Sequence, residues 1–232
     1  MSERKTNLNS KRKLRNLLLT FLVTAIFIAV LFISAGNFAW FWGWILSGIM
    51  IVSNVVGVIL LDPELLEERT GVKSGSKRKD ILLASIMGRF GPLAIIITAG
   101  LDFRFDWSGS FPPVLAVPGI IFYALGVSLP LWAMRENRFF SSVVRIQRER
   151  GHHVITTGPY RLVRHPGYLG SVVAMLAVPF ALTSYWALIP AVITDMVSII
   201  RTALEDNILK RELEGYSKYA EKVRHRLIPD IW

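Results

Sequence analysis

Residues 40–61 read WFWGWILSGIMIVSNVVGVILL and contain no charged side chain. A stretch of this kind is typical of an α-helix that crosses a bilayer, which takes roughly 17–25 apolar residues. Five further apolar runs follow the same pattern: Leu17–Ala35, Ile81–Gly100, Val114–Met134, Tyr168–Thr183 and Trp186–Leu204. The six runs predict an all-α integral membrane protein with about five to six transmembrane helices.

The composition agrees with this prediction. Of the 232 residues, 52% are hydrophobic and only 19% are charged. The segments between the runs are short, which leaves no room for a separate soluble catalytic domain. The chain has no Cys, and this excludes disulfides and thiolate catalysis.

The charge distribution predicts an orientation. The net charge is +10, and almost all of the 27 Lys and Arg residues lie in 1–16, 69–79, 135–164 and from 201 onward. These are alternate connections, and short loops rich in Lys and Arg stay cytoplasmic. We therefore expect both termini in the cytoplasm, with 1–16 as a basic tail attracted to anionic membrane lipids. A nucleic acid partner is disfavoured, because no aromatic platforms alternate with the basic residues.

Two runs leave alternatives open. The first follows a basic tail, as a signal peptide does, but it exceeds a typical signal-peptide core and is expected to stay as helix. The fifth is the shortest and contains Pro179. It is either a tilted full span or half of a re-entrant hairpin. In both cases the last two runs form a helical hairpin.

The sequence TTGPYRLVRHPGYLG at 156–170 carries most of the polar chemistry near a span. Gly158-Pro159 is a turn signal, and His165 should be extended because a proline follows it. Pro166 is suited to be the first helical residue of the fifth span. The positive end of that helix would then lie beside Arg164 and His165, as in an anion site. The alternative is a membrane anchor with a proline at the helix start.

The sixth run ends in RTALED at 201–206. At 1.5 Å per residue, both arms of a hairpin that turns near Ser184 return to the same membrane side. We therefore predict that Arg164 and His165 face the acidic pair Glu205-Asp206. The alternative is that the acids form pairs within their own helix, Arg201–Glu205 and Asp206–Lys210.

Several familiar sites are missing from the sequence. It has no G-x-G-x-x-G fingerprint, no P-loop and no H-E-x-x-H motif. The four His residues are His152, His153, His165 and His225, and only the first two are close together. Because adjacent side chains point apart, no metal is predicted.

TGPYRLVRHPGYLG at 157–170, with the acidic pair at 205–206, resembles the superfamily of isoprenylcysteine carboxyl methyltransferases and phospholipid methyltransferases. The similarity extends upstream through NRFF at 137–140 and VRIQ at 144–147. It extends downstream through ELEGY at 212–216 and RHRLIP at 224–229. It covers roughly residues 60–232. The family usually has two Glu where this chain has Glu205-Asp206.

The resemblance implies an integral membrane methyltransferase that uses S-adenosylmethionine without a Rossmann domain. It implies a cytoplasmic cofactor-binding loop and C-terminal helix in a catalytic region, 135–232, which forms one domain with the helices of 17–134. Arg226, Glu205 and Arg164 are the implied catalytic residues, with Arg226 and Gln147 near the acceptor. The implied cofactor-binding residues are Gln147, His152, Gly158, Pro159, Tyr160, Arg164, His165, Tyr168, Gly170, Glu205 and Asp206.

The expected reaction is carboxyl O-methylation of an isoprenylcysteine-like acceptor, a lipophilic small molecule or a prenylated substrate. The alternatives are N-methylation of a phospholipid amine and reduction by a sterol-reductase-like enzyme that uses NADPH. A channel or transporter is supported only by Arg89 and Asp195, two charged residues within spans. Such charges are usually paired or functional. We expect these two either to approach each other or to line the active-site cavity, and the alternative is a structural pair.

Overall fold

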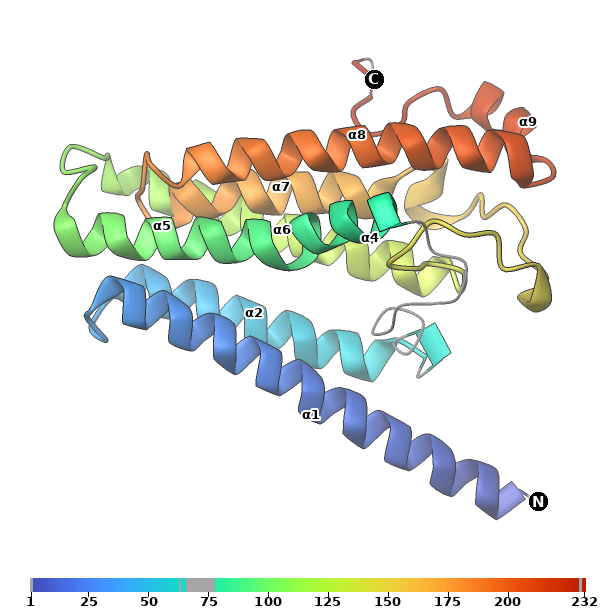
Figure 1. Ribbon diagram of the computed structural model, residues 1–232, viewed down its shortest axis with the longest axis horizontal. Coiled ribbons are helices and arrows are strands. Elements are labelled where there is room, and N and C mark those ends of the chain that lie inside the picture. The colour runs from blue at the N-terminus through green and yellow to red at the C-terminus, as the bar shows by residue number, and fades with distance from the viewer. Residues whose placement is uncertain (1, 63, 66–77, 230) are drawn as a thin grey trace.

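Figure 1 shows the computed structural model, which describes residues 2–62, 64–65, 78–229 and 231–232. These residues form helices and connecting loops without any strand, as predicted. Long helices run back and forth along one axis, and both termini lie toward the same end (Figure 1). The long helices are α1 (Ser2–Ala35), α2 (Phe41–Leu60), α5 (Gly91–Phe105), α6 (Ala116–Glu136), α7 (Pro166–Ala181) and α8 (Leu188–Glu212).

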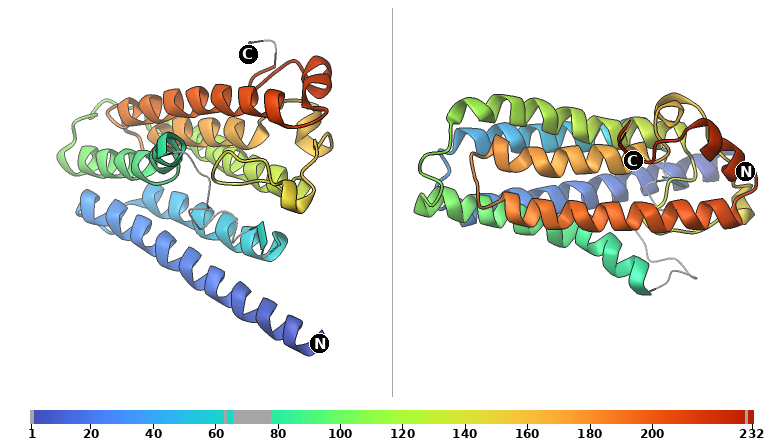
Figure 2. Two further views of the ribbon diagram at one scale, coloured as in Figure 1. Left: turned by 45° about the vertical axis from the view of Figure 1, so that its right-hand side comes forward. Right: turned by 90° about the horizontal axis from the view of Figure 1, so that it is seen from above.

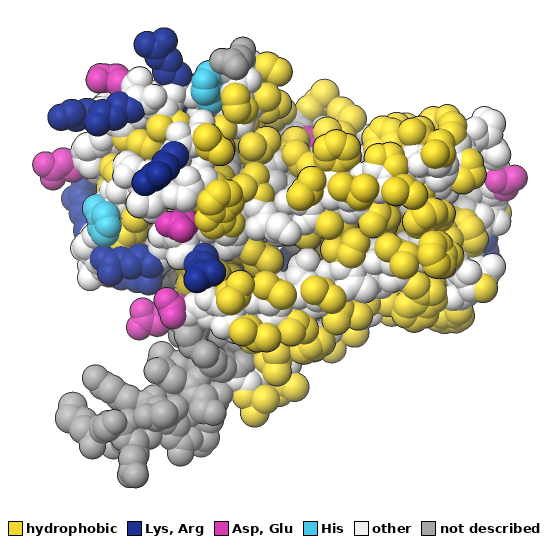
Figure 3. All heavy atoms as spheres, turned by 180° about the vertical axis from the view of Figure 1, so that it is seen from behind, with side chains coloured by type: hydrophobic (Ala, Val, Ile, Leu, Met, Phe, Trp, Pro, Cys, Tyr) yellow, Lys and Arg dark blue, Asp and Glu magenta, His cyan; other side chains and the backbone are white. Residues whose placement is uncertain are grey.

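Four helical segments are long and apolar enough to cross a membrane: Leu14–Ala35, Phe41–Leu60, Asp80–Phe105 and Pro113–Glu136. They match the first four predicted spans and support an integral membrane protein. Helix α7 is a shorter apolar helix of 16 residues. It forms the predicted hairpin with α8. Helix α8 is not among the four candidate spans because it contains several charged residues. Apolar side chains cover the length of the bundle, and most of the charged ones visible in Figure 3 gather at one end.

The helix before α5 contains an irregular turn that the sequence pattern did not predict. Helix α4 (Arg78–Ser85) passes through the π-helical turn η1 (Ile86–Phe90) directly into α5. The predicted run from Ile81 to Gly100 is therefore one continuous span with a widened turn inside it. Such turns occur frequently at functional sites.

Close contact between α6 and α7 fixes where the motif at 156–170 lies. A Cβ added to Gly126 would stand 2.6 Å from the backbone nitrogen of Ala174. A Cβ on Gly170 would stand 2.5 Å from the carbonyl oxygen of Gly126. Small residues let helix backbones touch where lipid offers no competing hydrophobic force. The start of α7 is thereby held beside the end of α6.

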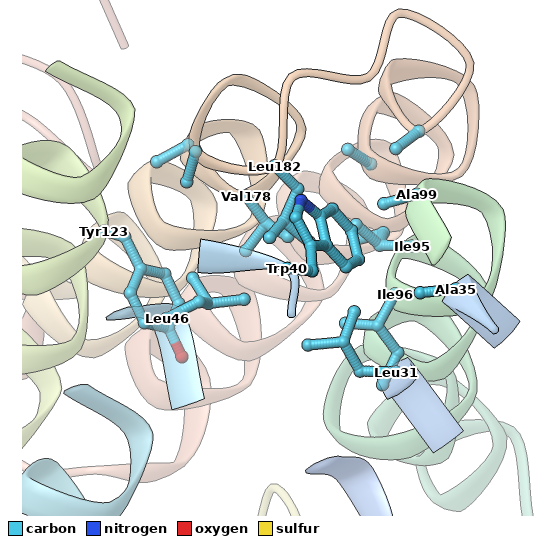
Figure 4. Packing of buried hydrophobic residues seen from close by; sticks show 14 of the residues in the cluster. Leu31, Ala35, Trp40, Leu46, Ile95, Ile96, Ala99, Tyr123, Val178 and Leu182 are labelled. Carbon is cyan, nitrogen blue, oxygen red and sulfur yellow. The ribbon is translucent and has the colours of Figure 1, made fainter. Parts of the chain in front are cut away.

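The apolar core lies in the other half of the bundle. Leu31 of α1, Ile95 of α5 and Val178 of α7 are buried together around Trp40, which precedes α2 (Figure 4). The core ties the first two helices to the hairpin. It leaves the opposite end of the bundle for polar groups.

A buried polar cluster holds the turn of the α7–α8 hairpin. Asp102 is 2% exposed and accepts hydrogen bonds from the backbone nitrogen of Ser108 (2.7 Å) and from the hydroxyls of Ser108 and Ser184. Ser184 lies where the sequence predicts the turn. The cluster fixes the turn against α5, so the free ends of α7 and α8 return to the same end of the bundle.

The prediction for Arg89 and Asp195 is wrong as a pair and as part of the cavity described below. Arg89 lies in η1 with an exposed side chain, whereas Asp195 is buried in α8. Both carboxylate oxygens of Asp195 lack a hydrogen-bond partner. Among the described residues, neither side chain lines that cavity. Arg89 and Asp195 lie on neighbouring helices, but this alone does not pair their charges.

Candidate functional site

A cavity of about 270 Å³ lies at the end of the bundle where α6, α7 and α8 meet the loops. Its wall is built from the α4–η1 segment, the connection between α6 and α7, the start of α7, the end of α8 and the short helix α9 (Tyr216–Lys222). The polar lining includes Asn137, Arg145, His152, Tyr160, Arg164, His165, Tyr168, Ser198, Arg201, Glu205, Tyr216 and Tyr219.

The predicted turn and helix start position the cavity wall. Gly158 has a φ of +54°, in the left-handed region that favours glycine, and a Cβ there would stand 2.5 Å from Cγ of Glu136. Helix α7 begins at Pro166, as predicted, but His165 has φ −127° and ψ 62°, which lies outside the extended region that the sequence predicted for it. Tyr160 is held at both ends. Its hydroxyl accepts from Asn137 (3.1 Å), and its carbonyl accepts from the hydroxyl of Tyr219 (2.7 Å).

The two distant segments meet as predicted, and Asp206 is the centre of the contact. Its side chain is 0% exposed. Oδ1 accepts from Nε of Arg164 (2.8 Å) and from the hydroxyl of Tyr216 (3.0 Å), and Nε2 of His165 lies 3.3 Å away. Oδ2 accepts from Nε of Arg226 (3.0 Å) and lies 3.2 Å from Nζ of Lys210.

The charge of Asp206 is stabilised by its neighbours. Burial raises the pKa of this carboxyl, but hydrogen bonds from His165, Arg164 and Arg226 outweigh burial and hold the pKa below its ordinary value. Asp206 is therefore ionised and faces Arg164 instead of the cavity. Burial raises the pKa of Tyr216, and the adjacent Asp206 raises it further, so this phenol stays neutral.

Arg164 is largely occupied by contacts within the protein. Its Nη1 donates to the carbonyl oxygens of Val223 and Arg224, both at 2.7 Å, while Nε and Nη2 bind Asp206. The backbone nitrogen of Arg164 also donates to the carbonyl of His225 (3.0 Å). Arg164 thus ties the C-terminal segment to the start of α7 and closes one wall of the cavity.

Glu205 has a different environment from its neighbour. It lines the cavity, and its Oε2 accepts a hydrogen bond from the hydroxyl of Tyr168 (2.7 Å). Consecutive residues of an α-helix point about 100° apart, which sends Glu205 into the cavity and Asp206 into the buried cluster. The acidic pair therefore divides into one accessible and one buried carboxylate.

Arg201 and Asp80 form a contact that the sequence did not reveal. Nε of Arg201 lies 2.9 Å from Oδ1 of Asp80, and Nη2 donates to the carbonyl of Ser142 (2.6 Å). Asp80 also accepts from the backbone nitrogen of Val144 (2.8 Å). The alternative of an Arg201–Glu205 pair is not what the structure has, whereas the Asp206–Lys210 pair is present. The sequence signal for this contact was Arg201 itself, which lies about one helical turn before the acidic pair.

An aromatic stack supports the loop before the motif. Phe139 stacks on His152 with ring centroids 4.5 Å apart, and Gln147, which is 0% exposed, donates to the carbonyl of Phe139 (2.7 Å). Burial lowers the pKa of His152 to about 4, and the neighbouring His153 and Arg145 lower it further. His152 is therefore neutral at physiological pH.

The predicted site residues divide into two groups. His152, Tyr160, Arg164, His165, Tyr168 and Glu205 line the cavity. The other six lie behind its wall, namely Gln147, Gly158, Pro159, Gly170, Asp206 and Arg226. The sequence did not identify Arg201, Asp80 and Tyr216 as site residues. Arg201 binds Asp80, and Tyr216 donates to Asp206.

Comparisons with known proteins match the part of the chain that builds this cavity. Residues 114–214 match the family "Phospholipid methyltransferase". Two relatives, each named "Probable protein-S-isoprenylcysteine O-methyltransferase", come from Oryza sativa subsp. indica and Oryza sativa subsp. japonica. Each is 29% identical over 116 residues, which are 49% of this chain. The match spans 60% of the length of each relative.

The family match covers α6, α7, α8 and the connection before α7 that carries Tyr160, Arg164 and His165. Glu205 lies on α8. The relatives' names and the family description agree with the resemblance of the motifs at 157–170 and 205–206. These findings support a similarity of residues 114–214 to the superfamily of isoprenylcysteine carboxyl methyltransferases and phospholipid methyltransferases.

Proposed function

We propose that this protein is an integral membrane methyltransferase that transfers a methyl group from S-adenosylmethionine to a lipophilic acceptor, in the cavity at the loop end of the bundle. The observation that carries the proposal is the convergence of Glu205, Tyr168 and His165 on one cavity within the part that matches the methyltransferase family. The catalytic region, 135–232, works as one unit with the helices before it.

The residues in the cavity fit the chemical groups of S-adenosylmethionine, which would supply a methyl group on a positively charged sulfur. Glu205 offers a carboxylate for the ammonium or for the ribose hydroxyls. The positive end of α7 beside His165 suits a carboxylate. The neutral rings of Phe139 and His152 offer apolar faces for the adenine.

Carboxyl O-methylation of an isoprenylcysteine-like acceptor is the reaction we favour. A carboxylate is a nucleophile without further activation, so the protein needs only to position it. Arg201 lines the cavity and is held rigidly by Asp80 and Ser142, which suits it to orient an anionic acceptor. Arg226 lies behind Asp206 and supports the wall.

N-methylation of a phospholipid amine is the second candidate. The family that residues 114–214 match is described as phospholipid methyltransferase, which favours a phospholipid acceptor. An amine acceptor requires a base to take its proton. Glu205 is the carboxylate in the lining that is placed for this role. The basic loops at this end of the bundle support a site on the cytoplasmic side in either case.

Calorimetric titration of the purified protein with S-adenosylhomocysteine tests the proposal. We expect binding in the micromolar range and no binding of NADPH, which a sterol-reductase-like enzyme would bind. Binding of NADPH without binding of S-adenosylhomocysteine would overturn the proposed function.

A further inference from the structure

The cavity continues beyond its polar end into the apolar part of the bundle. Its lining includes Met175 of α7 and Ser198 of α8, together with Ala84, Met87 and Gly88 of the α4–η1 segment. At 1.5 Å per residue, Met175 lies roughly 13 Å along α7 from Pro166, and Ser198 lies roughly 10 Å along α8 from Glu205. The cavity is therefore elongated, with a polar end and an apolar end.

Two contacts join the α4–α5 segment to α8 on either side of this apolar part. At one side a Cβ added to Gly91 would stand 2.5 Å from Cγ2 of Thr194, so the backbone at Gly91 is in close contact with the Thr194 side chain. At the other side Arg201 reaches Asp80 across 2.9 Å. Helix α4 diverges from α8 toward its N-terminal end when the bundle is seen from above (Figure 2).

Between these contacts the cavity is lined by the small residues Ala84, Gly88 and Ser198 and by Met87. Ala84 of α4 and Gly88 of η1 lie between Asp80 and Gly91 on one segment, and Ser198 lies between Thr194 and Arg201 on the other. The hydroxyl of Ser198 is satisfied by the carbonyl of Thr194 (3.0 Å) and presents no free donor. This part of the cavity is thus bordered by three small residues and one flexible methionine, which leave room for an apolar chain.

Gly88 marks where this part of the cavity meets the surroundings of the bundle. It lines the cavity and is itself exposed, and a Cβ built on it would meet nothing within 4 Å. It also belongs to the candidate membrane span Asp80–Phe105. An exposed cavity residue at this depth borders an opening toward lipid instead of water.

We propose that the opening between the α4–η1 segment and α8 admits the hydrocarbon tail of the methyl acceptor from the bilayer, and that Gly88 keeps this opening wide. The inference rests on the proposed function and adds the route and the residue that selects for the tail. The tail would lie against Ala84, Met87 and Met175 while the headgroup reaches Arg201 and Glu205.

A thiol at the opening tests where the tail lies. The chain has no Cys, so Gly88→Cys carries a single thiol, and Gly48→Cys is the matched control because Gly48 of α2 also has nothing within 4 Å of a built Cβ. The rate of modification by an alkyl methanethiosulfonate is measured with S-adenosylhomocysteine present. The probes are N-acetyl-S-farnesyl-cysteine in one arm and lysophosphatidylethanolamine in the other.

We expect one of the two probes to slow modification of Gly88→Cys and neither to slow that of Gly48→Cys. The effective probe identifies the tail as prenyl or acyl. Gly88→Leu should weaken binding of that probe about tenfold, because the leucine side chain would occupy the open space through which the tail enters, while Gly48→Leu leaves it unchanged. Binding of S-adenosylhomocysteine should be the same in all four variants and the wild type.

The outcomes separate the two proposals. If S-adenosylhomocysteine binds normally but neither probe protects Gly88→Cys, the tail route is wrong and the proposed function stands. Equal probe affinity in Gly88→Leu and the wild type would also overturn the tail route. Failure of the wild type to bind S-adenosylhomocysteine would overturn both proposals.

Discussion

Glu205→Gln should weaken the binding of S-adenosylhomocysteine roughly 10- to 100-fold, since a hydrogen bond to a charged group contributes about 1.5–3 kcal/mol. Glu205 lines the cavity, and its carboxylate is fixed by the hydroxyl of Tyr168 at 2.7 Å. The amide keeps the shape of the side chain and removes only its charge. Calorimetric titration measures the loss directly.

The control for this variant is Glu212→Gln. Glu212 is exposed at the end of the same helix and does not line the cavity. It should bind S-adenosylhomocysteine as the wild type does. The thermal unfolding midpoint of Glu205→Gln in detergent should stay close to that of the wild type, because Glu205 is not part of the buried cluster around Asp206. Unchanged affinity in Glu205→Gln would remove this carboxylate from the cofactor site.

Asp206→Asn should destabilise the protein by about 3–5 kcal/mol, the cost of leaving buried charges without their partner. Arg164 is 5% exposed and spends Nε and Nη2 on Asp206, so removing this charge strands a buried guanidinium. The thermal unfolding midpoint in detergent measures the effect. Asp195→Asn is the matched control on the same helix, because the buried Asp195 carboxylate has no hydrogen-bond partner to lose. It should leave the midpoint unchanged or raise it.

The contribution of Asp206 to the stability of the folded protein should also depend on pH. Its pKa is lower in the folded protein than in the unfolded chain, where it is about 4, so ionised Asp206 stabilises the folded state above that pH. The stabilisation is lost as the pH falls through the lower folded-state pKa. The difference in unfolding midpoint between wild type and Asp206→Asn should therefore be constant from neutral pH down to about pH 5 and shrink only below about pH 4. A difference that disappears near pH 6 would mean that a group other than Asp206 controls the stability of the cluster.

The sequence predicts the helices well because apolar length is a local property of the chain. It also predicts that Arg164 and His165 meet Asp206, since the lengths of two helices joined by a turn determine which ends coincide. Helical geometry also explains why Glu205 points into the cavity and Asp206 into the buried cluster, once the position of the cavity is known.

Other features depend on contacts that no local pattern encodes. Asp80 and Arg201 are far apart in the sequence, and their pairing depends on how α4 leans against α8. The π-helical turn at Ile86–Phe90 has the same apolar composition as a regular helix. The burial of Gln147 behind Phe139 depends on the path of an irregular loop. These features emerge only when the whole bundle is assembled.

The central claim is that the segments around His165 and Glu205 bind one methyl donor together. Ultraviolet cross-linking of the purified protein with methyl-labelled S-adenosylmethionine, followed by peptide mapping, tests it most directly. The label should fall on peptides that contain residues 137–168 or 201–219, and S-adenosylhomocysteine should suppress it. Label confined to the opposite end of the bundle, around Asp102 and Ser184, would contradict the account.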